Sequence, residues 1–366
     1  MLRFLFFVMT MCSIVSSSAQ SKLMFLFSDS TTDKHHGFLG YPAFSYAPET
    51  RLSVGLSLIY YFRTNKRDSS YRPSIMHPVA AYTEDKQFYL ENPFQLFFDK
   101  EKYYIYGIAA YYNYPYNFYG IGNGVPRSYV EKYNSIYGNY DISFLRKINR
   151  HWYGGIKLKG GYYSITQTIP GDLLASGTIT GSKGGNSIGI GPMFLFDSRD
   201  NIFASTKGSF VEISSAFNSK HLLSNYSFAS FILDARKFIS IKKNVFAFQT
   251  YMSAVTGNAP FYQLSLLGGP KRMRGYYEGR YRDNDYIMAQ CEYRSPFVMN
   301  RFGLVIFAGA GTVFHNINSF NPTYIQPSYG GGLRLKFNRK ESLHVRLDAA
   351  FGNNTMGYYL YLSEAF

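Results

Sequence analysis

Apolar and polar residues alternate along this chain almost to its last residue, and this alternation limits the possible folds severely. In residues 52–63 and 343–351 an apolar side chain recurs at every second position, with mostly polar residues between. A period of two residues is typical of β-strands, whose side chains point alternately to the two faces of a sheet. No stretch reaches the roughly 18 consecutive apolar residues of a transmembrane helix. The sequence therefore predicts an all-β protein.

Composition indicates which kind of β protein this is. Aromatic residues make up 19% of the 366 residues and charged residues only 17%, whereas soluble domains carry about 25% charged residues. The abundance of aromatic residues excludes intrinsic disorder, and a mean hydropathy of −0.18 excludes a bundle of membrane helices. Strands that alternate between a lipid-facing and a lumen-facing side chain have this average composition. In lipid every strand must pair on both sides, so the sheet must close into a transmembrane antiparallel β-barrel.

The alternating segments predict a barrel of about 16 strands, which is an even number and places both termini on the periplasmic side. One connection, residues 256–285, is much longer than the others, and long connections in compact folds are usually functional. The predicted strands are residues 39–46, 52–63, 72–83, 86–98, 102–114, 130–148, 152–165, 187–197, 207–218, 226–239, 244–255, 286–297, 302–313, 327–337, 343–351 and 355–366.

The first residues predict export. Residues 1–19 contain a basic residue, a short apolar run and small residues before Gln20, which is the pattern of a secretory signal peptide. We therefore divide the chain into a signal peptide (1–19), a short N-terminal segment (20–38) and an outer-membrane β-barrel (39–366). In an exported barrel, the net charge of +15 favours a basic lumen and contacts with anionic lipid headgroups over nucleic acid.

The long connection contains the sequence Gly-Gly-Pro-Lys-Arg-Met-Arg-Gly-Tyr at residues 268–276. Together with four other segments, it resembles the BamA/TamA superfamily of sixteen-stranded outer-membrane barrels, the bacterial surface antigen family, whose sixth extracellular loop carries an Arg-Gly-aromatic tip. The four segments are Phe-Tyr-Gly-Ile-Gly at 118–122, Phe-Asp-Ser-Arg-Asp-Asn at 196–201 with Lys207-Gly208, Phe-Ala-Gly-Ala-Gly-Thr-Val at 307–313, and the aromatic carboxy-terminal segment 359–366.

The resemblance implies a non-enzymatic barrel linked to protein insertion or translocation, here expected to lack POTRA domains, with the long loop inserted into the lumen. Its implied partners are outer-membrane lipid, lipopolysaccharide, and periplasmic or outer-membrane assembly proteins. Three groups of site residues follow from it. They are a loop-lock motif (Met273, Arg274, Gly275, Tyr276, Glu292), family strand motifs (Asp197, Arg199, Asp200, Gly208, Gly309, Gly311) and a C-terminal insertion signal in which Phe366 closes the barrel against the first strand (Tyr358, Leu360, Leu362, Phe366).

Residue types and spacing support the loop lock independently. Arg274 offers a rigid fork of donors suited to a carboxylate, and Gly275 permits a sharp turn. Glu292 lies on the polar side of its alternating segment, so it faces the lumen if the apolar side faces lipid. Gly309 stands where the family usually has an acidic partner, which leaves Glu292 as the expected partner of Arg274. The alternative is that Arg274 is solvated in a flexible basic loop.

Other functions remain open. A passive pore or substrate channel would have an open lumen and measurable conductance. An outer-membrane hydrolase would need a Ser–His pair, but the Gly-x-Ser-x-Gly pattern around Ser187 precedes a strand instead of a helix. His35-His36 has no third ligand nearby, and Cys291 lies beside apolar neighbours. We therefore expect no metal site, no reactive thiol and no cofactor.

Overall fold

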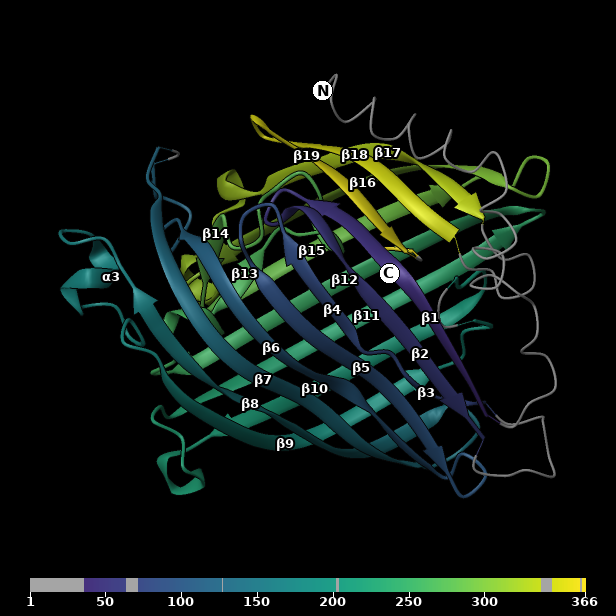
Figure 1. The fold of residues 1–366 in the computed structure, drawn as a ribbon, viewed down its shortest axis with the longest axis horizontal. Coiled ribbons are helices and arrows are strands. Elements are labelled where there is room, and N and C mark those ends of the chain that lie inside the picture. The colour runs from purple at the N-terminus through teal and green to yellow at the C-terminus, as the bar shows by residue number, and fades with distance from the viewer. Residues whose placement is uncertain (1–35, 64–71, 127, 202–203, 337–343, 363) are drawn as a thin grey trace.

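The computed structural model is a closed antiparallel β-barrel (Figure 1). It describes residues 36–63, 72–126, 128–201, 204–336, 344–362 and 364–366, so the predicted signal peptide lies outside the described residues. Within these ranges the wall has 16 strand positions, which confirms the predicted barrel. Because this number is even, β1 (His36–Ala47) begins and β19 (Thr355–Leu362) ends at the same end of the barrel. We call this the terminal end and the opposite end the loop end.

The strands agree with the predicted segments to within a few residues. Those between β1 and β19 are β2 (Arg51–Phe62), β3 (Ser74–Met76), β4 (Val79–Thr83), β5 (Phe88–Phe98), β6 (Tyr103–Phe118), β7 (Glu131–Lys147), β8 (Trp152–Gln167), β9 (Gly185–Asp197), β10 (Gly208–Asn218), β11 (Phe228–Ile241), β12 (Asn244–Gly257), β15 (Asp285–Arg294), β16 (Phe302–Phe314), β17 (Gln326–Lys336) and β18 (His344–Gly352). A small hairpin, β13 (Ser265–Leu267) and β14 (Tyr281–Asp283), lies in the connection between β12 and β15.

The third wall position differs from the prediction because it consists of two strands. β3 and β4 both pair with β2 on one side and β5 on the other, and the break falls at His77 and Pro78. Pro78 has no N–H to donate to the ladder, although its carbonyl still accepts from the N–H of Leu58 at 2.9 Å. The register on both sides is unchanged across the break, and the wall therefore stays continuous.

The helical segments of the described chain are short and lie in connections. α3 (Leu173–Ser176) is at the loop end, on the left of Figure 1. The 3₁₀ turns are η2 (Lys220–Leu222), η3 (Phe261–Gln263), η4 (Ile317–Ser319) and η5 (Pro322–Tyr324). No helix in the described ranges has the length and apolar character needed to cross a membrane.

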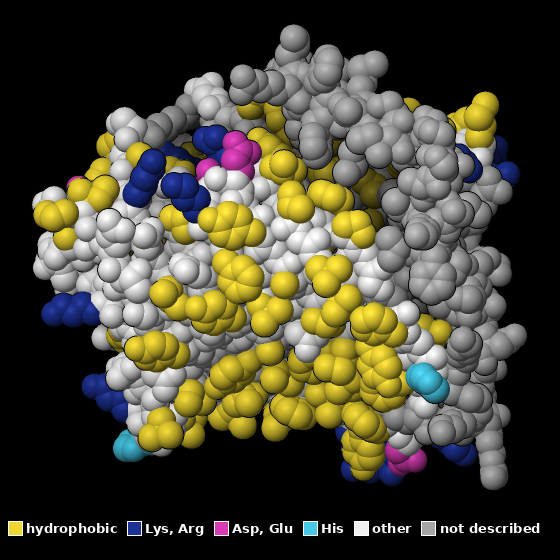
Figure 2. Space-filling view, viewed as in Figure 1, with side chains coloured by type: hydrophobic (Ala, Val, Ile, Leu, Met, Phe, Trp, Pro, Cys, Tyr) yellow, Lys and Arg dark blue, Asp and Glu magenta, His cyan; other side chains and the backbone are white. Residues whose placement is uncertain are grey.

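The two faces of the wall differ as the alternation predicts. On β16, Leu304 and Ile306 are exposed on the outer face, whereas Val305 and Phe307 are buried on the inner face. Figure 2 shows hydrophobic side chains spread over the visible outer face, with charged side chains mainly at its margins. An apolar outer surface of this kind is typical of a barrel that faces lipid.

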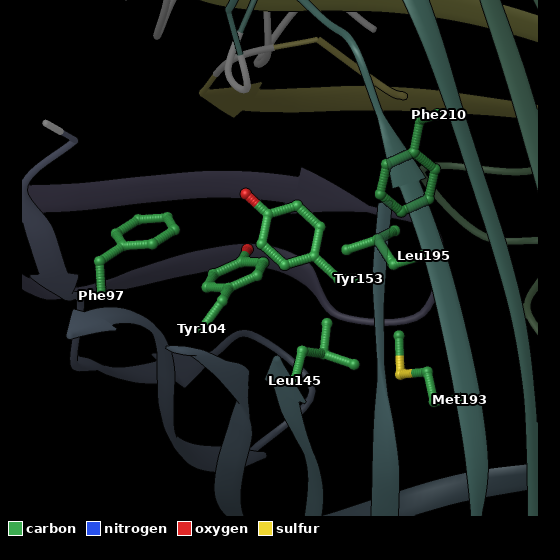
Figure 3. Close-up of a cluster of buried hydrophobic side chains, with 7 residues drawn as sticks. All are labelled: Phe97, Tyr104, Leu145, Tyr153, Met193, Leu195 and Phe210. Carbon is green, nitrogen blue, oxygen red and sulfur yellow. The ribbon is translucent and has the colours of Figure 1, made fainter. Parts of the chain in front are cut away.

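The inner face carries a cluster of buried side chains at the terminal end. Phe97, Tyr104, Leu145, Tyr153, Met193, Leu195 and Phe210 come from six neighbouring strands, β5 to β10, and face one another (Figure 3). The rings of Phe97 and Tyr104 stack with centroids 4.5 Å apart. Such aromatic pairs add stability beyond the area they bury, so the cluster stabilises this part of the wall.

The barrel closes through a short contact between its first and last strands. All 12 residues of β1 have a partner on β2, but only Tyr46 faces a residue of β19, namely Leu360, among the described residues. We call this contact the seam. The seam has far less backbone pairing than any other pair of neighbouring wall positions in the described chain.

The expectation that Phe366 closes the barrel is wrong. β19 ends at Leu362, and Phe366 is buried in a cluster with Phe238 of β11, while Arg294 donates to its backbone oxygen at 3.0 Å. Continuing the strand would place Glu364 on the same face as the outward Leu360 and Leu362. A carboxylate is costly on a lipid-facing surface, and leaving the strand lets Glu364 reach buried cations.

Candidate functional site

The connection between β12 and β15 brings its tip, residues 273–276, onto the inner face of the wall. Met273 and Tyr276 are fully buried and pack with Tyr286 and Met288 of β15 and with Val313 of β16. The β13–β14 hairpin forms the base of this tip and belongs to the same cluster. The loop is therefore a packed part of the barrel.

Arg274 lies between two carboxylates from different strands. Its Nη2 donates to Glu292 Oε2 on β15 and its Nη1 to Asp348 Oδ2 on β18, each at 2.6 Å. The guanidinium also stands over the ring of Phe307, 3.5 Å from the centroid. All three ionic groups are almost completely buried. Charge-assisted hydrogen bonds of this length are among the strong ones, and they position the loop tip.

The two carboxylates belong to a larger buried network of four arginines and three acids. Its members alternate in charge, so no buried carboxylate depends on a single cation. The ion pairs beyond Arg274 are Glu292 with Arg294 (2.8 Å) and Arg334 (3.9 Å), Asp348 with Arg334 (2.6 Å) and Arg346 (3.6 Å), and Glu364 with Arg334 (2.9 Å) and Arg294 (3.8 Å). His344 Nε2 also lies 2.9 Å from Glu364.

Sequence reasoning identified Glu292 and missed Asp348. Asp348 does lie on the polar side of its alternating segment, so the signal for an inward side chain was present. Arg334 and Arg346 show the same alternation on β17 and β18. The sequence did not indicate which of these strands the loop would reach.

Gly275 and Tyr276 fit the tip closely against β17, β18 and β19. Gly275 has φ +102°, and a Cβ there would lie 2.8 Å from the carbonyl carbon of Phe351. Only glycine suits that backbone and that spacing. The Tyr276 hydroxyl donates to the carbonyl of Pro327 and accepts from the backbone N–H of Asn353, both at 2.7 Å.

The loop also contacts both sides of the seam. On the β19 side, the N–H of Gly275 donates to the Tyr359 hydroxyl at 2.8 Å and Thr355 donates to the Gly275 carbonyl at 2.7 Å. On the β1 side, the N–H of Glu278 donates to Glu49 Oε1 at 2.6 Å, and Glu49 lies in the turn between β1 and β2. The loop therefore bridges a place where the strands themselves pair little.

Glu49 makes this bridge sensitive to pH. Its side chain is buried, and Oε2 has no hydrogen-bond partner among the described residues. Burial, together with the nearby charge of Glu278, raises the pKa of Glu49 to about 7. A raised pKa means that the folded state favours the protonated acid. The resulting stability is present at low pH and is lost as pH rises from about 4.5 to about 7.

Replacing Glu49 by glutamine is therefore expected to remove part of the pH dependence of stability. We compare the free energies of unfolding of the variant and the wild type in denaturant. The difference in favour of the variant should grow by about 2–3 kcal/mol between about pH 5 and pH 8, because only the wild type loses stability as Glu49 ionises. Glu84→Gln, which changes an exposed carboxylate in the neighbouring turn, is the control and should follow the wild type. A Glu49→Gln profile parallel to the wild type would contradict the assignment.

The predicted strand-motif residues form a turn at the terminal end. Arg199 donates from Nε and Nη2 to the two carboxylate oxygens of Asp197, both at 2.9 Å. Asp200 accepts from the Thr206 hydroxyl and from the N–H groups of Thr206 and Lys207. Gly208 has φ +105°, and a Cβ there would clash with the Ser198 carbonyl. These residues shape the β9–β10 turn and do not contact the loop tip.

Gly309 and Gly311 lie on the inner face of β16, opposite Gln290 and Met288 of β15. A Cβ at either glycine would come within 2.8 Å of the facing Cβ. Gln290 donates to the carbonyl of Lys271 in the loop at 3.0 Å. The glycines therefore leave room on the wall where the loop packs.

Tyr358, Leu360 and Leu362 lie on β19, and only Phe366 of the C-terminal set leaves the strand.

Ser187 lies inside β9 near its start, as the strand interpretation expected, and its hydroxyl has no hydrogen-bond partner in the described chain. Cys291 is exposed on the outer face. The described residues contain no group of three side chains that could hold a metal ion.

Comparison with solved structures agrees with this fold. The chain is similar to BamA from Haemophilus ducreyi lacking POTRA domains 1–3, with a TM-score of 0.60, 12% identity, and coverage of 90% of this chain and 70% of that one. It is also similar to CdiB from Acinetobacter baumannii, with a TM-score of 0.55, 12% identity, and coverage of 90% of this chain and 60% of that one. Curated protein sequences give no match.

The family follows from the sequence itself. The model of the Omp85 superfamily domain matches residues 62–351, which is most of the chain. This stretch includes the loop tip and all the strands that the tip contacts except β19. The family and the barrel fold indicate an outer-membrane protein. The chain therefore belongs to the Omp85 superfamily.

Proposed function

We propose that this barrel takes part in the insertion or translocation of other proteins at the outer membrane, with the β1 edge as the place where a client strand docks. The observation that carries the proposal is the seam, where only Tyr46 of β1 faces β19 among the described residues. An unpaired strand edge is a template for pairing with another chain. Addition of a client strand there would be β-augmentation.

The loop supports the same proposal. It contacts Tyr359 on one side of the seam and Glu49 on the other. Its tip is fixed to β15 and β18 by Arg274. A loop held in this way keeps the barrel closed while the strands at the seam contribute little pairing of their own. Opening would then require that only a few hydrogen bonds break at the edge.

The experiment uses a disulfide across the seam. Tyr46→Cys and Leu360→Cys are combined in a Cys291→Ser background, and the full chain is placed in lipid vesicles. The client is a urea-denatured eight-stranded outer-membrane barrel protein, whose folding rate is followed by its heat-modifiable electrophoretic mobility. We expect the reduced barrel to accelerate client folding, the oxidised barrel to lose that acceleration, and reductant to restore it.

A matched control locates the effect. Ala308→Cys with Tyr329→Cys crosslinks two facing residues of the neighbouring strands β16 and β17, away from the seam, and should leave the acceleration intact. Equal inhibition by both crosslinks, or full activity of the oxidised seam, would contradict the proposal. Vesicles that conduct small ions without accelerating client folding would favour a passive channel instead.

A further inference from the structure

A groove lies on the outer face of the barrel, near the terminal end of strands β5 to β8. It has a volume of about 450 Å³ and is lined mainly by apolar side chains, including Phe98, Phe144 and Ile156. Small-molecule sites have volumes of about 300–1,000 Å³, so the groove is large enough for part of a lipid. All three of these side chains are exposed, as expected of a surface that faces the membrane.

The strand register explains why the wall is hollowed here. One row across the wall consists of Tyr103, Arg146 and Gly154, which face one another on β6, β7 and β8. Gly154 also faces Phe194 on β9. A Cβ at Gly154 would approach only side chains, the nearest being Ile148 at 3.1 Å. Gly154 therefore lines the groove without a side chain of its own, between the aromatic and aliphatic side chains around it.

Arg146 is the charged side chain of this groove. It is exposed, and it lies on the same face of β7 as the exposed Phe144. No ion pair joins it to another described residue. An arginine on a lipid-facing surface is destabilising unless it is near the interface or meets an anion. Its planar fork of donors fits a phosphate.

We propose that the groove binds one anionic phospholipid, with the phosphate held by Arg146 and an acyl chain lying over Gly154. The charge that favours an anion is that of Arg146 itself, because the basic residue of the neighbouring turn, Lys102, is already paired with Asp99 at 3.4 Å. Charge complementarity thus selects an anionic headgroup over a zwitterionic one, whose ammonium would be repelled. The inner face behind the groove is the buried, packed cluster that contains Tyr104 and Leu145, which supports the wall under the site.

The test is native mass spectrometry of the full chain in neutral detergent, titrated with phosphatidylglycerol or with phosphatidylcholine of the same acyl chains. The wild type should bind phosphatidylglycerol about fivefold more tightly, as one basic side chain near a membrane surface provides. Arg146→Gln should lower the ratio of the affinities for phosphatidylglycerol and phosphatidylcholine to about one. Gly154→Leu, which fills the groove, should weaken the binding of both lipids without changing their ratio.

Two control variants separate the groove from the general surface. Arg150→Gln removes a charge from the exposed turn after β7, and Gly138→Leu adds an outward side chain on β7 far from the groove, with only one backbone oxygen near its Cβ. Both should bind lipid as the wild type does. Equal effects of Arg150→Gln and Arg146→Gln would overturn the proposal. Equal affinity of the wild type for the two lipids, or displacement of the lipid by inorganic phosphate alone, would overturn it as well.

Discussion

Replacement of Arg274 by alanine is expected to lower the free energy of unfolding by about 3 kcal/mol. The substitution leaves Glu292 and Asp348 buried without the cation that lies 2.6 Å from each. Removing one partner of a buried ion pair typically costs about 3–5 kcal/mol. The lower end applies because Glu292 keeps Arg294 and Asp348 keeps Arg334. Unfolding by guanidinium in lipid vesicles, followed by the fluorescence of the single tryptophan, Trp152, measures the loss.

Arg272→Ala is the matched control for this prediction. It removes the same charge from the same loop, but Arg272 stacks on the ring of Tyr251 at 3.8 Å and has no ion pair with a described residue. Arg272 is half-buried, and a cation–π contact contributes about 0.5–2 kcal/mol depending on its burial, so this variant should lose less stability than Arg274→Ala. Protease cleavage within residues 268–280 should accelerate in Arg274→Ala alone. Equal losses in the two variants would contradict the loop lock. They would support the alternative interpretation, in which Arg274 is solvated in a flexible basic loop.

The fold was largely predictable because alternation is a local property. Each lipid-facing strand must show a period of two by itself, whatever its neighbours are, so the segments could be counted without knowing the topology. The break in the third wall position at Pro78 was not predictable from proline alone, because Pro93 and Pro115 lie inside the unbroken strands β5 and β6. Strand pairing then follows from chain order in an antiparallel barrel.

The site was less predictable because it depends on distances around the wall. Alternation placed both Glu292 and Asp348 on inward faces, but β15 and β18 are three wall positions apart, about 14 Å at the usual strand spacing. Whether one side chain reaches both depends on where the loop crosses the lumen. That path is fixed by the packing of Met273 and Tyr276 against the wall. The alternation of apolar and polar residues carries no information about this packing.

The error at Phe366 had a different origin. The prediction extended the last strand to the end of the chain and gave weight to the aromatic residue there. Glu364 was the contrary signal, since it would share the outward face with Leu360 and Leu362. In the structure it pairs with Arg334 at 2.9 Å instead. The cost of a carboxylate in lipid outweighed the pairing of the last four residues of the predicted strand.

Replacement of Gly275 by alanine is expected to destabilise the barrel by about 2–5 kcal/mol, from two causes that add. The left-handed backbone at φ +102° costs a residue with a Cβ about 1–2 kcal/mol. The Cβ would also lie 2.8–3.1 Å from backbone atoms of Phe351 and Gly352. Backbone atoms of a paired strand cannot give way as a flexible side chain can, and overpacking of this kind costs about 1–3 kcal/mol.

Gly171→Ala separates these two causes. Gly171 has a similar φ of +93°, but nothing lies within 4 Å of the position of its Cβ, so this variant should show only the backbone cost. The extra loss in Gly275→Ala then measures the fit of the loop tip against β18. Moving the tip away from β18 would also lengthen the bonds of Arg274, the adjacent residue. The double variant Arg274→Ala/Gly275→Ala should therefore lose clearly less than the sum of the two single losses. Strict additivity would mean that Gly275 shapes the loop without holding Arg274 against its carboxylates.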